Sequence, residues 1–195
     1  GAQLLEAMSK AGVGRLVNTG TYFQYFDDDA YRPLNLYAAT KQAFESLVAY
    51  YTDAGTLEAV TVVLYDVYGP GDARGKLFAT IQEAQRTGRP LPLPADDVIL
   101  DLVHVDDVAA ALLHAAADVE PGTYAASSGE RHKLSQVIDL FEELGGRSIE
   151  RDRGAYEAPA RYIGEPWRGP GLPGWQAGVT LREGIRRQLG ENRDD

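Results

Sequence analysis

Tyr37 and Lys41 are the residues whose types and spacing first suggest chemistry. They lie four positions apart in NLYAATKQAFE, residues 35–45, and this spacing puts both side chains on one face of a helix. The pKa of a free phenol is about 10, too high for a general acid or base at neutral pH. A neighbouring ammonium lowers such a pKa because it stabilises the phenolate. A second hydroxyl would orient a substrate oxygen, and Thr21 is suitably placed at the end of the preceding predicted strand.

The Tyr37–Lys41 pair also has a purely structural explanation, and so do several other residues that could belong to a site. Tyr and Lys are common, so the pair could be a surface lysine beside an interfacial tyrosine. Gly69-Pro70-Gly71 could be only a turn after a strand, and His104 a strand-end histidine whose ring is satisfied by hydrogen bonds. Asp106 is expected to be the N-cap of a helix over 107–117, with Asp107 facing water.

Composition limits the classes of function. The chain has 195 residues, is 44% hydrophobic and carries a formal charge of −10, which argues against nucleic acid as a partner. It contains no Cys, so disulfides and thiolate chemistry are excluded and a cytoplasmic location is expected. We expect no metal site, because no two of the three His stand at zinc-site spacing. No apolar run reaches the roughly 18 residues of a membrane span.

The elements that must position Tyr37 and Lys41 alternate between helix and strand. Helices are predicted over 1–12, 36–52, 76–88 (ended by Gly88), 107–117 and 134–146, with a last one near the C-terminus. Strands are predicted over 15–19, 59–69, 99–105 and 123–127. This alternation predicts an α/β protein with a mainly parallel sheet. Residues 153–176 are rich in Gly, Pro and Arg and are expected to form a long loop, such as a lid over a ligand.

Four segments resemble the extended short-chain dehydrogenase/reductases of the NAD-dependent epimerase/dehydratase family. They are RLVNTGTYFQY, NLYAATKQAFE, VVLYDVYGPGDARGKL and LDLVHVDDVAAALLHA, in the family's order and at compatible spacing. The residues of the first two segments are most similar to those of nucleotide-sugar 4-ketoreductases. The resemblance implies the C-terminal portion of a Rossmann-like core over 1–70 and a small α/β substrate-binding lobe over 71–190, interleaved with the last core elements. A polar tail would occupy 191–195.

The same resemblance implies roles for individual residues. Tyr37 would be the catalytic acid/base, Lys41 its partner, and Thr21 the hydroxyl that holds the substrate oxygen. The residues implied to meet NAD or NADP are Thr19, Tyr37, Lys41, Tyr65 and Val67. Those implied to meet a nucleotide-sugar substrate are Thr21, Asp66, Arg74, Lys76 and Arg168.

Several positions depart from the family's pattern. Asp66 stands where many relatives carry Asn, and an ionised Asp cannot donate the hydrogen bond that an Asn can. Leu100 stands where many relatives carry Arg, so Arg168 is expected to supply a replacement cation. A dehydratase would need an Asp-Glu pair after Thr21, and Tyr22 and Phe23 occupy those positions instead.

The sequence contains no strand followed by the glycine-rich turn and helix that bind a dinucleotide pyrophosphate in this family. We therefore expect the chain to be the C-terminal part of a longer enzyme. Two alternatives are that a separate chain supplies the dinucleotide half, or that this is a truncated, non-catalytic relative that binds a sugar nucleotide or a partner chain.

The function that these inferences favour is an NAD(P)-dependent oxidoreductase or epimerase acting at C4 of a nucleotide-linked (deoxy)sugar. The resemblance also implies a homodimer, in which the helices over 1–12 and 36–52 pack against the partner's copies.

Overall fold

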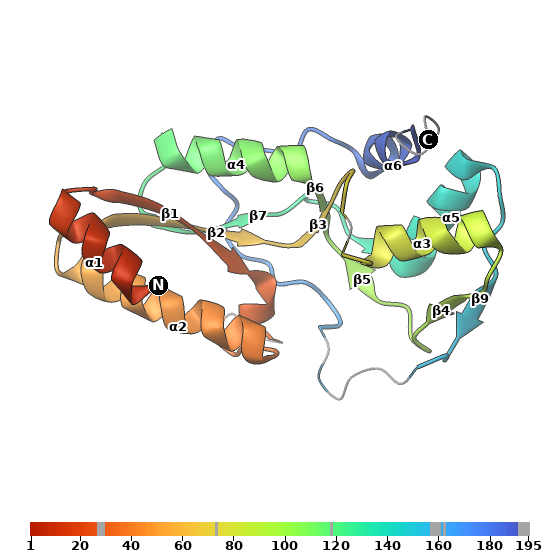
Figure 1. The fold of residues 1–195 in the computed structure, drawn as a ribbon, viewed down its shortest axis with the longest axis horizontal. Helices are drawn as coiled ribbons and strands as arrows, with labels where there is room; N and C mark the ends of the chain where they lie inside the picture. Colours follow the sequence, from red (N-terminus) through yellow and green to blue (C-terminus); the bar gives the residue numbers. More distant parts are fainter. Residues whose placement is uncertain (27–29, 73, 118, 157–160, 162, 191–195) are drawn as a thin grey trace.

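The computed structural model describes residues 1–26, 30–72, 74–117, 119–156, 161 and 163–190 (Figure 1). Helices and strands alternate along this chain and the strand pairing is mainly parallel, as the sequence predicts. Within the described ranges, no helix combines the length and the apolar composition needed to cross a membrane.

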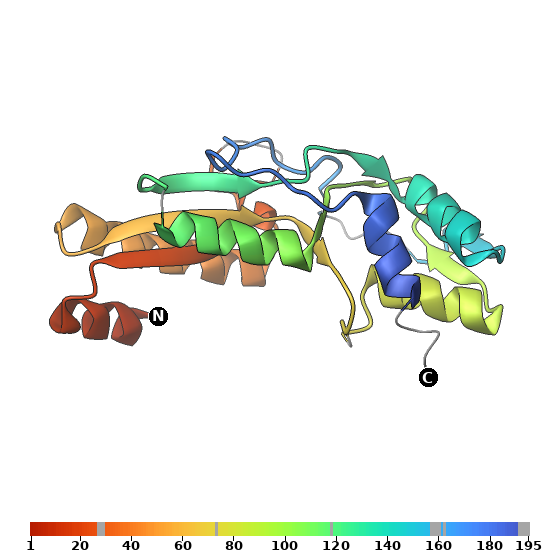
Figure 2. The same cartoon turned by 90° about the horizontal axis from the view of Figure 1, so that it is seen from above.

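The larger sheet consists of three parallel strands in the order β1-β2-β7. These strands span Arg15–Thr21 (β1), Glu58–Leu64 (β2) and Gly122–Ala126 (β7). Two helices, α1 (Ala2–Ala11) and α2 (Leu36–Asp53), cover one face, and α4 (Val105–Ala117) covers the other (Figures 1 and 2).

The central strand of this sheet is buried on both faces. Val60, Val62 and Val63 of β2 expose none of their surface. Val60 and Val62 belong to one hydrophobic cluster with Ala111 and Ala115 of α4. A parallel strand with helices on both sides favours apolar side chains at nearly every position, and the exception inside β2, the buried Thr61, accepts a hydrogen bond from Asn18.

A second hydrophobic core lies beside the larger sheet, formed mainly by elements of the C-terminal part of the chain. Its helices are α3 (Leu77–Thr87), α5 (Leu134–Gly145) and α6 (Leu181–Gly190), packed around Ile81, Ile138 and Phe141. Short strand pairs border it: β3 (Asp66–Tyr68) with β6 (Leu102–His104), β4 (Leu91–Leu93) with β9 (Arg151–Arg153), and β5 (Ile99–Leu100) with β8 (His132–Lys133). The helix α3 ends at Gly88, as predicted, with a left-handed φ of 69°.

Two strands predicted as continuous are each divided in two. The run 59–69 forms β2 and β3, which separate at Tyr65 because β2 pairs with β1 and β7 whereas β3 pairs with β6. The run 99–105 forms β5 and β6, which separate at Asp101, and Val105 already belongs to α4. Both divisions occur where the chain passes from one set of strand partners to another, and a hydrophobic pattern does not record that change.

The predicted roles of Asp106 and Asp107 are wrong. The helix α4 begins at Val105, and the backbone N–H of Asp106 donates to Nδ1 of His104 at 3.2 Å, so His104 acts as the cap. Asp107 does not face water, because only 8% of it is exposed. Its carboxylate accepts hydrogen bonds from the backbone N–H groups of Gly178 and Val179 at 2.9 and 3.0 Å, and it thereby fixes the segment that leads into α6.

Candidate functional site

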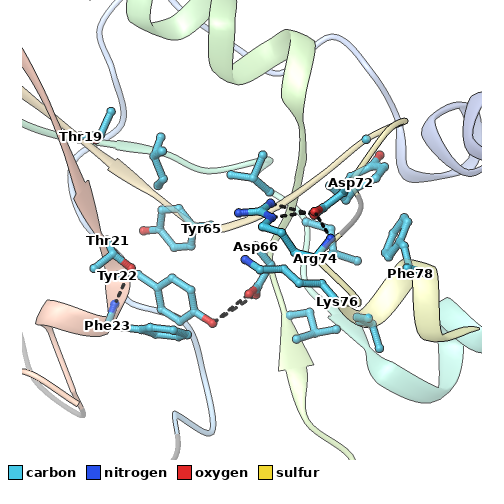
Figure 3. A pocket seen from close by; sticks show the side chains of 18 of the residues that line it. Thr19, Thr21, Tyr22, Phe23, Tyr65, Asp66, Asp72, Arg74, Lys76 and Phe78 are labelled. Atoms are coloured by element: carbon cyan, nitrogen blue, oxygen red, sulfur yellow. Dashed lines mark hydrogen bonds and ion pairs between the residues drawn. The ribbon is translucent and has the colours of Figure 1, made fainter. Parts of the chain in front are cut away.

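A cavity of about 670 Å³ opens at the carboxyl ends of β1 and β2 and extends to the start of α3 (Figure 3). This edge of a parallel α/β sheet is where such folds bind ligands. Nearly all of the predicted site residues line it, namely Thr19, Thr21, Tyr37, Lys41, Tyr65, Asp66, Val67, Arg74 and Lys76. Leu100, which stands where many relatives carry Arg, lines the cavity as well.

The helix α2 carries Tyr37 and Lys41 to the cavity. Asn35 caps this helix, since its side-chain oxygen accepts the backbone N–H of Ala38 at 2.9 Å. The ammonium of Lys41 donates to the carbonyl oxygen of Thr19 at 3.0 Å and to its hydroxyl at 3.4 Å. Nζ of Lys41 lies 6.0 Å from the ring centroid of Tyr37. Tyr37 itself is 53% exposed, and its phenol is therefore accessible from the cavity.

Thr21 is held at the end of β1 by a short 3-10 helix, η1 (Tyr22–Gln24). The backbone N–H of Thr21 donates to Oε1 of Gln24 at 2.9 Å, and the Thr21 hydroxyl accepts the N–H of Phe23 at 3.4 Å. These reciprocal bonds form a capping box. They use the Thr21 oxygen as an acceptor and leave its O–H as a donor toward the cavity.

A buried glutamate of α2, not predicted from the sequence, lies against Gly20 of β1. Glu45 is 8% exposed and accepts a hydrogen bond from the hydroxyl of Tyr31. A Cβ at Gly20 would lie 3.0 Å from Glu45 and 3.2 Å from Gln24, so only glycine lets the strand approach these side chains without displacing them. Glu45 lies one helical turn after Lys41, and this spacing was the signal available in the sequence.

Tyr65, between β2 and β3, connects the cavity wall to the C-terminal segment. It is 6% exposed, and its hydroxyl donates to the carbonyl oxygen of Trp167 at 2.7 Å. The indole of Trp167 stacks on Tyr25 with centroids 3.9 Å apart. Burial raises the pKa of the Tyr65 phenol above its ordinary value, so this hydroxyl stays protonated at neutral pH.

Arg168, predicted to bind the substrate, does not line the cavity. Its side chain is 73% exposed and pairs with Glu165 at 3.3 Å. The neighbouring Trp167 turns inward to meet Tyr25, and successive side chains of an extended segment point to opposite sides. The structure does not bring Arg168 to the cavity with the other predicted site residues, and its role as a substrate ligand stays a prediction.

Arg74 and Lys76 line the far end of the cavity and differ in their partners. Arg74 makes a bidentate ion pair with Asp72, at 2.6 and 2.7 Å. This hydrogen-bonded guanidinium holds the pKa of the Asp72 carboxyl at about 2. Lys76 has no ion pair with any residue in the described part of the chain, and its ammonium is the less engaged of the two cations.

Asp66 is a cavity carboxyl whose pKa is raised. The hydroxyl of Tyr22 donates to both of its carboxylate oxygens, at 3.3 and 3.2 Å (Figure 3). Burial, together with the nearby Asp101, raises the pKa of Asp66 to about 6, although Tyr22 and Lys76 act in the opposite direction. At pH 7 most of the carboxyl is ionised, so it accepts hydrogen bonds where an Asn amide would also donate one.

The raised pKa of Asp66 predicts a pH-dependent gain from Asp66→Asn. Because the pKa rises from 3.8 to about 6 on folding, the folded state holds the proton more tightly and stability falls as pH increases through this window. Asn can still accept from Tyr22 and carries no charge. We expect the variant to raise the free energy of unfolding by about 1–3 kcal/mol at pH 7.5 and by almost nothing at pH 4, measured by urea titration.

The control for this prediction is Asp72→Asn. Its carboxyl has a lowered pKa, so removing that charge is expected to cost a little stability at pH 7.5 rather than to add any. An equal gain in the free energy of unfolding for Asp66→Asn at both pH values would contradict the raised pKa of Asp66, because a gain that does not depend on pH cannot come from the carboxylate charge.

Behind Asp66, a fully buried carboxylate joins three elements. Asp101 is 0% exposed and accepts hydrogen bonds from the hydroxyl of Ser127, from the N–H and hydroxyl of Ser128 and from the guanidinium of Arg131. Arg131 also donates to the carbonyl oxygen of Trp167 at 3.3 Å and lies 5.7 Å from the ring centroid of Tyr65. This cluster was not predicted, because its one local signal in the sequence is a single Asp inside an apolar run.

A doubly covered parallel sheet with a ligand-sized cavity at its carboxyl edge defines a Rossmann-like α/β protein. The model of the NAD dependent epimerase/dehydratase family matches residues 1–126, and the chain belongs to this family. The CDP-abequose synthase of Yersinia pseudotuberculosis is 23% identical over 158 residues, which cover 78% of this chain and 56% of the synthase. The UDP-glucuronate 4-epimerase of Thermodesulfobacterium geofontis is 26% identical over 208 residues, covering 98% and 63%.

Two solved structures are similar to this chain in fold. The UDP-glucose 4-epimerase of Thermus thermophilus in complex with NAD superposes with a TM-score of 0.80 at 29% identity, covering 98% of this chain and 68% of that one. MoeE5 in complex with UDP-glucuronic acid and NAD gives a TM-score of 0.86 at 26% identity, covering 98% and 69%. The chain thus spans roughly 56–69% of the length of these relatives.

Proposed function

We propose that this chain carries the proton-transfer and sugar-binding residues of an NAD(P)-dependent oxidoreductase or epimerase that acts at C4 of a nucleotide-linked (deoxy)sugar. The observation that carries the proposal is one cavity lined by Thr21, Tyr37 and Lys41 at one end and by Arg74 and Lys76 at the other. Substrates named for relatives, UDP-glucose and UDP-glucuronic acid, have a sugar at one end and a diphosphate in the middle.

In this mechanism Tyr37 moves the proton. When the sugar is oxidised, the Tyr37 phenolate takes the proton of the C4 hydroxyl, and when the ketone is reduced it returns that proton. Thr21 donates a hydrogen bond to the same sugar oxygen and thereby holds it beside the phenol. Holding the oxygen and the acid/base in one geometry is what makes the proton transfer effective.

The residues at the end of β1 fit the nicotinamide ribose of NAD or NADP. An ammonium has three donors; Lys41 uses two on Thr19, and the third can bind a ribose hydroxyl. Tyr65 and Val67 supply an apolar wall for the ring. When bound, the nicotinamide accepts or supplies the hydride that accompanies the proton. The pyrophosphate is bound in this family by a glycine-rich turn that leads directly from a strand into a helix. Gly69 and Gly71 follow β3, but α3 begins only at Leu77, so this segment does not fit the pyrophosphate.

Lys76→Ala tests the diphosphate end of the proposal. We expect the variant to bind UDP-glucose about tenfold more weakly or worse, because it loses a charge-assisted hydrogen bond to a phosphate. Isothermal titration of UDP-, CDP- and dTDP-glucose against the wild type and the variant measures the change. Arg182→Ala is the matched control, since this exposed cation pairs with Glu143 outside the cavity and its loss should leave affinity unchanged.

The same titrations separate the enzyme from its alternative. Binding of a sugar nucleotide, together with turnover by the protein produced from its own gene in the presence of NAD or NADP, supports the proposal. Binding without any turnover would favour a non-catalytic reductase-fold protein. Failure of every sugar nucleotide to bind would overturn both.

We also propose that the chain works as a homodimer and that the α/β lobe within 71–190 is its substrate lobe. In support of the dimer, α1 and α2 expose large apolar side chains on the outside of the sheet, including Leu4, Leu47 and Tyr50, which are 53%, 40% and 67% exposed. A second copy packed on these helices would cover them.

A further inference from the structure

The cavity has an uneven distribution of charge. Its acidic residues are Asp66 and Asp72, and its basic residues are Lys41, Arg74 and Lys76. Asp72 is neutralised by the bidentate contact with Arg74, and Lys41 is engaged by Thr19. Asp66 makes no ion pair within the described chain, and the neutral hydroxyl of Tyr22 donates to both of its carboxylate oxygens.

Asp66 also occupies a central position. In Figure 3 its carboxylate lies between Tyr22, next to Thr21, on one side and the amine end of Lys76 on the other. A sugar whose reacting oxygen is held by Thr21 and whose phosphate is held by Lys76 must pass over Asp66. With Lys76 occupied by the phosphate, no cation of the cavity is left to balance the Asp66 charge.

The groups around Asp66 reinforce its acceptor character. The backbone N–H of Asp66 donates to the carbonyl oxygen of Asp101 at 3.0 Å, and the Asp101 carboxylate is itself compensated by Arg131. Tyr22 stacks on Tyr65 with centroids 5.3 Å apart and planes at 6°, which fixes the direction of its hydroxyl. The Asp66 oxygens therefore retain lone pairs toward the cavity, in a setting where unbalanced charge is costly.

From this geometry we infer that Asp66, oriented by Tyr22, selects nucleotide sugars with an uncharged hexose or deoxyhexose and rejects nucleotide-linked uronic acids. A sugar hydroxyl donates to the carboxylate, whereas a sugar carboxylate offers no donor and is repelled at close range. Rejecting the wrong ligand by an opposed charge is an established route to specificity. The inference rests on the proposed function and names the substrate class for the same site.

The test uses UDP-glucose and UDP-glucuronic acid, which share the nucleotide and the diphosphate and differ only at C6 of the sugar. In the wild type we expect UDP-glucose to bind at least about tenfold more tightly than UDP-glucuronic acid at pH 7.5. In Asp66→Asn the ratio of the two dissociation constants should fall to within about threefold of one. The contribution of Lys76 cancels in this ratio.

Asp72→Asn is the matched control, because it removes a cavity carboxylate that Arg74 already neutralises, and the ratio should stay at its wild-type value. Circular dichroism at the assay temperature verifies that each variant is folded. A ratio near one in the wild type, or a ratio unchanged by Asp66→Asn, overturns this inference and leaves the proposed function standing. Failure of both ligands to bind the wild type would instead overturn the proposed function, and this inference with it.

Discussion

Tyr37→Phe is expected to lower kcat by a factor of about 10²–10⁴, the usual contribution of a positioned general acid/base. The substitution removes only the phenolic oxygen. Since Tyr37 is 53% exposed and its ring packs in none of the hydrophobic clusters, the fold should not depend on that oxygen. Affinity for the sugar nucleotide and the free energy of unfolding should both stay near their wild-type values.

The measurement is steady-state turnover of a nucleotide sugar with NAD or NADP, on the protein produced from its own gene. Tyr50→Phe is the matched control. It removes the same atom from the same helix at a residue that is 67% exposed and does not line the cavity, so kcat should not change. Near-normal turnover in Tyr37→Phe would show that the proton is carried by another group.

Local patterns in the sequence were sufficient to predict the elements that carry this site. The alternation of helices and apolar strands predicts the α/β class, and the i, i+4 spacing puts Tyr37 and Lys41 on one face of α2. The carboxyl edge of a parallel sheet then brings Thr21 and Tyr65 to the same cavity. These inferences hold because each depends on a few neighbouring residues or on a general property of parallel sheets.

The remaining features depend on contacts between distant segments. Asp101 meets residues 26 to 30 positions away, and nothing near it in sequence specifies them. The exposure of Arg168 follows from the inward turn of Trp167, which depends on Tyr25 far upstream. The cap of α4 was misplaced by two residues because His104 is not a usual capping residue, and its imidazole Nδ1 takes the place of an Asp oxygen.

Asp101→Ala is expected to lower the free energy of unfolding by about 3–5 kcal/mol, a large share of the stability of a small protein. The reason is what the substitution leaves behind. The Arg131 guanidinium, 25% exposed, would lose its carboxylate partner, and Ser127 and Ser128 would lose their acceptor. An unpaired charge beside unsatisfied donors in a poorly hydrated site costs more than any single hydrogen bond contributes.

Urea denaturation at pH 7.5 measures this loss, with Asp97→Ala as the control. Asp97 is exposed and accepts the N–H and hydroxyl of Ser135 at the start of α5, so its removal should cost about 1 kcal/mol, as for a lost helix cap. The double variant Asp101→Ala/Arg131→Ala isolates the cause. Because it removes both charges, it should be more stable than Asp101→Ala alone. Strictly additive losses would mean that the carboxylate stabilises the fold through the serines and not through Arg131.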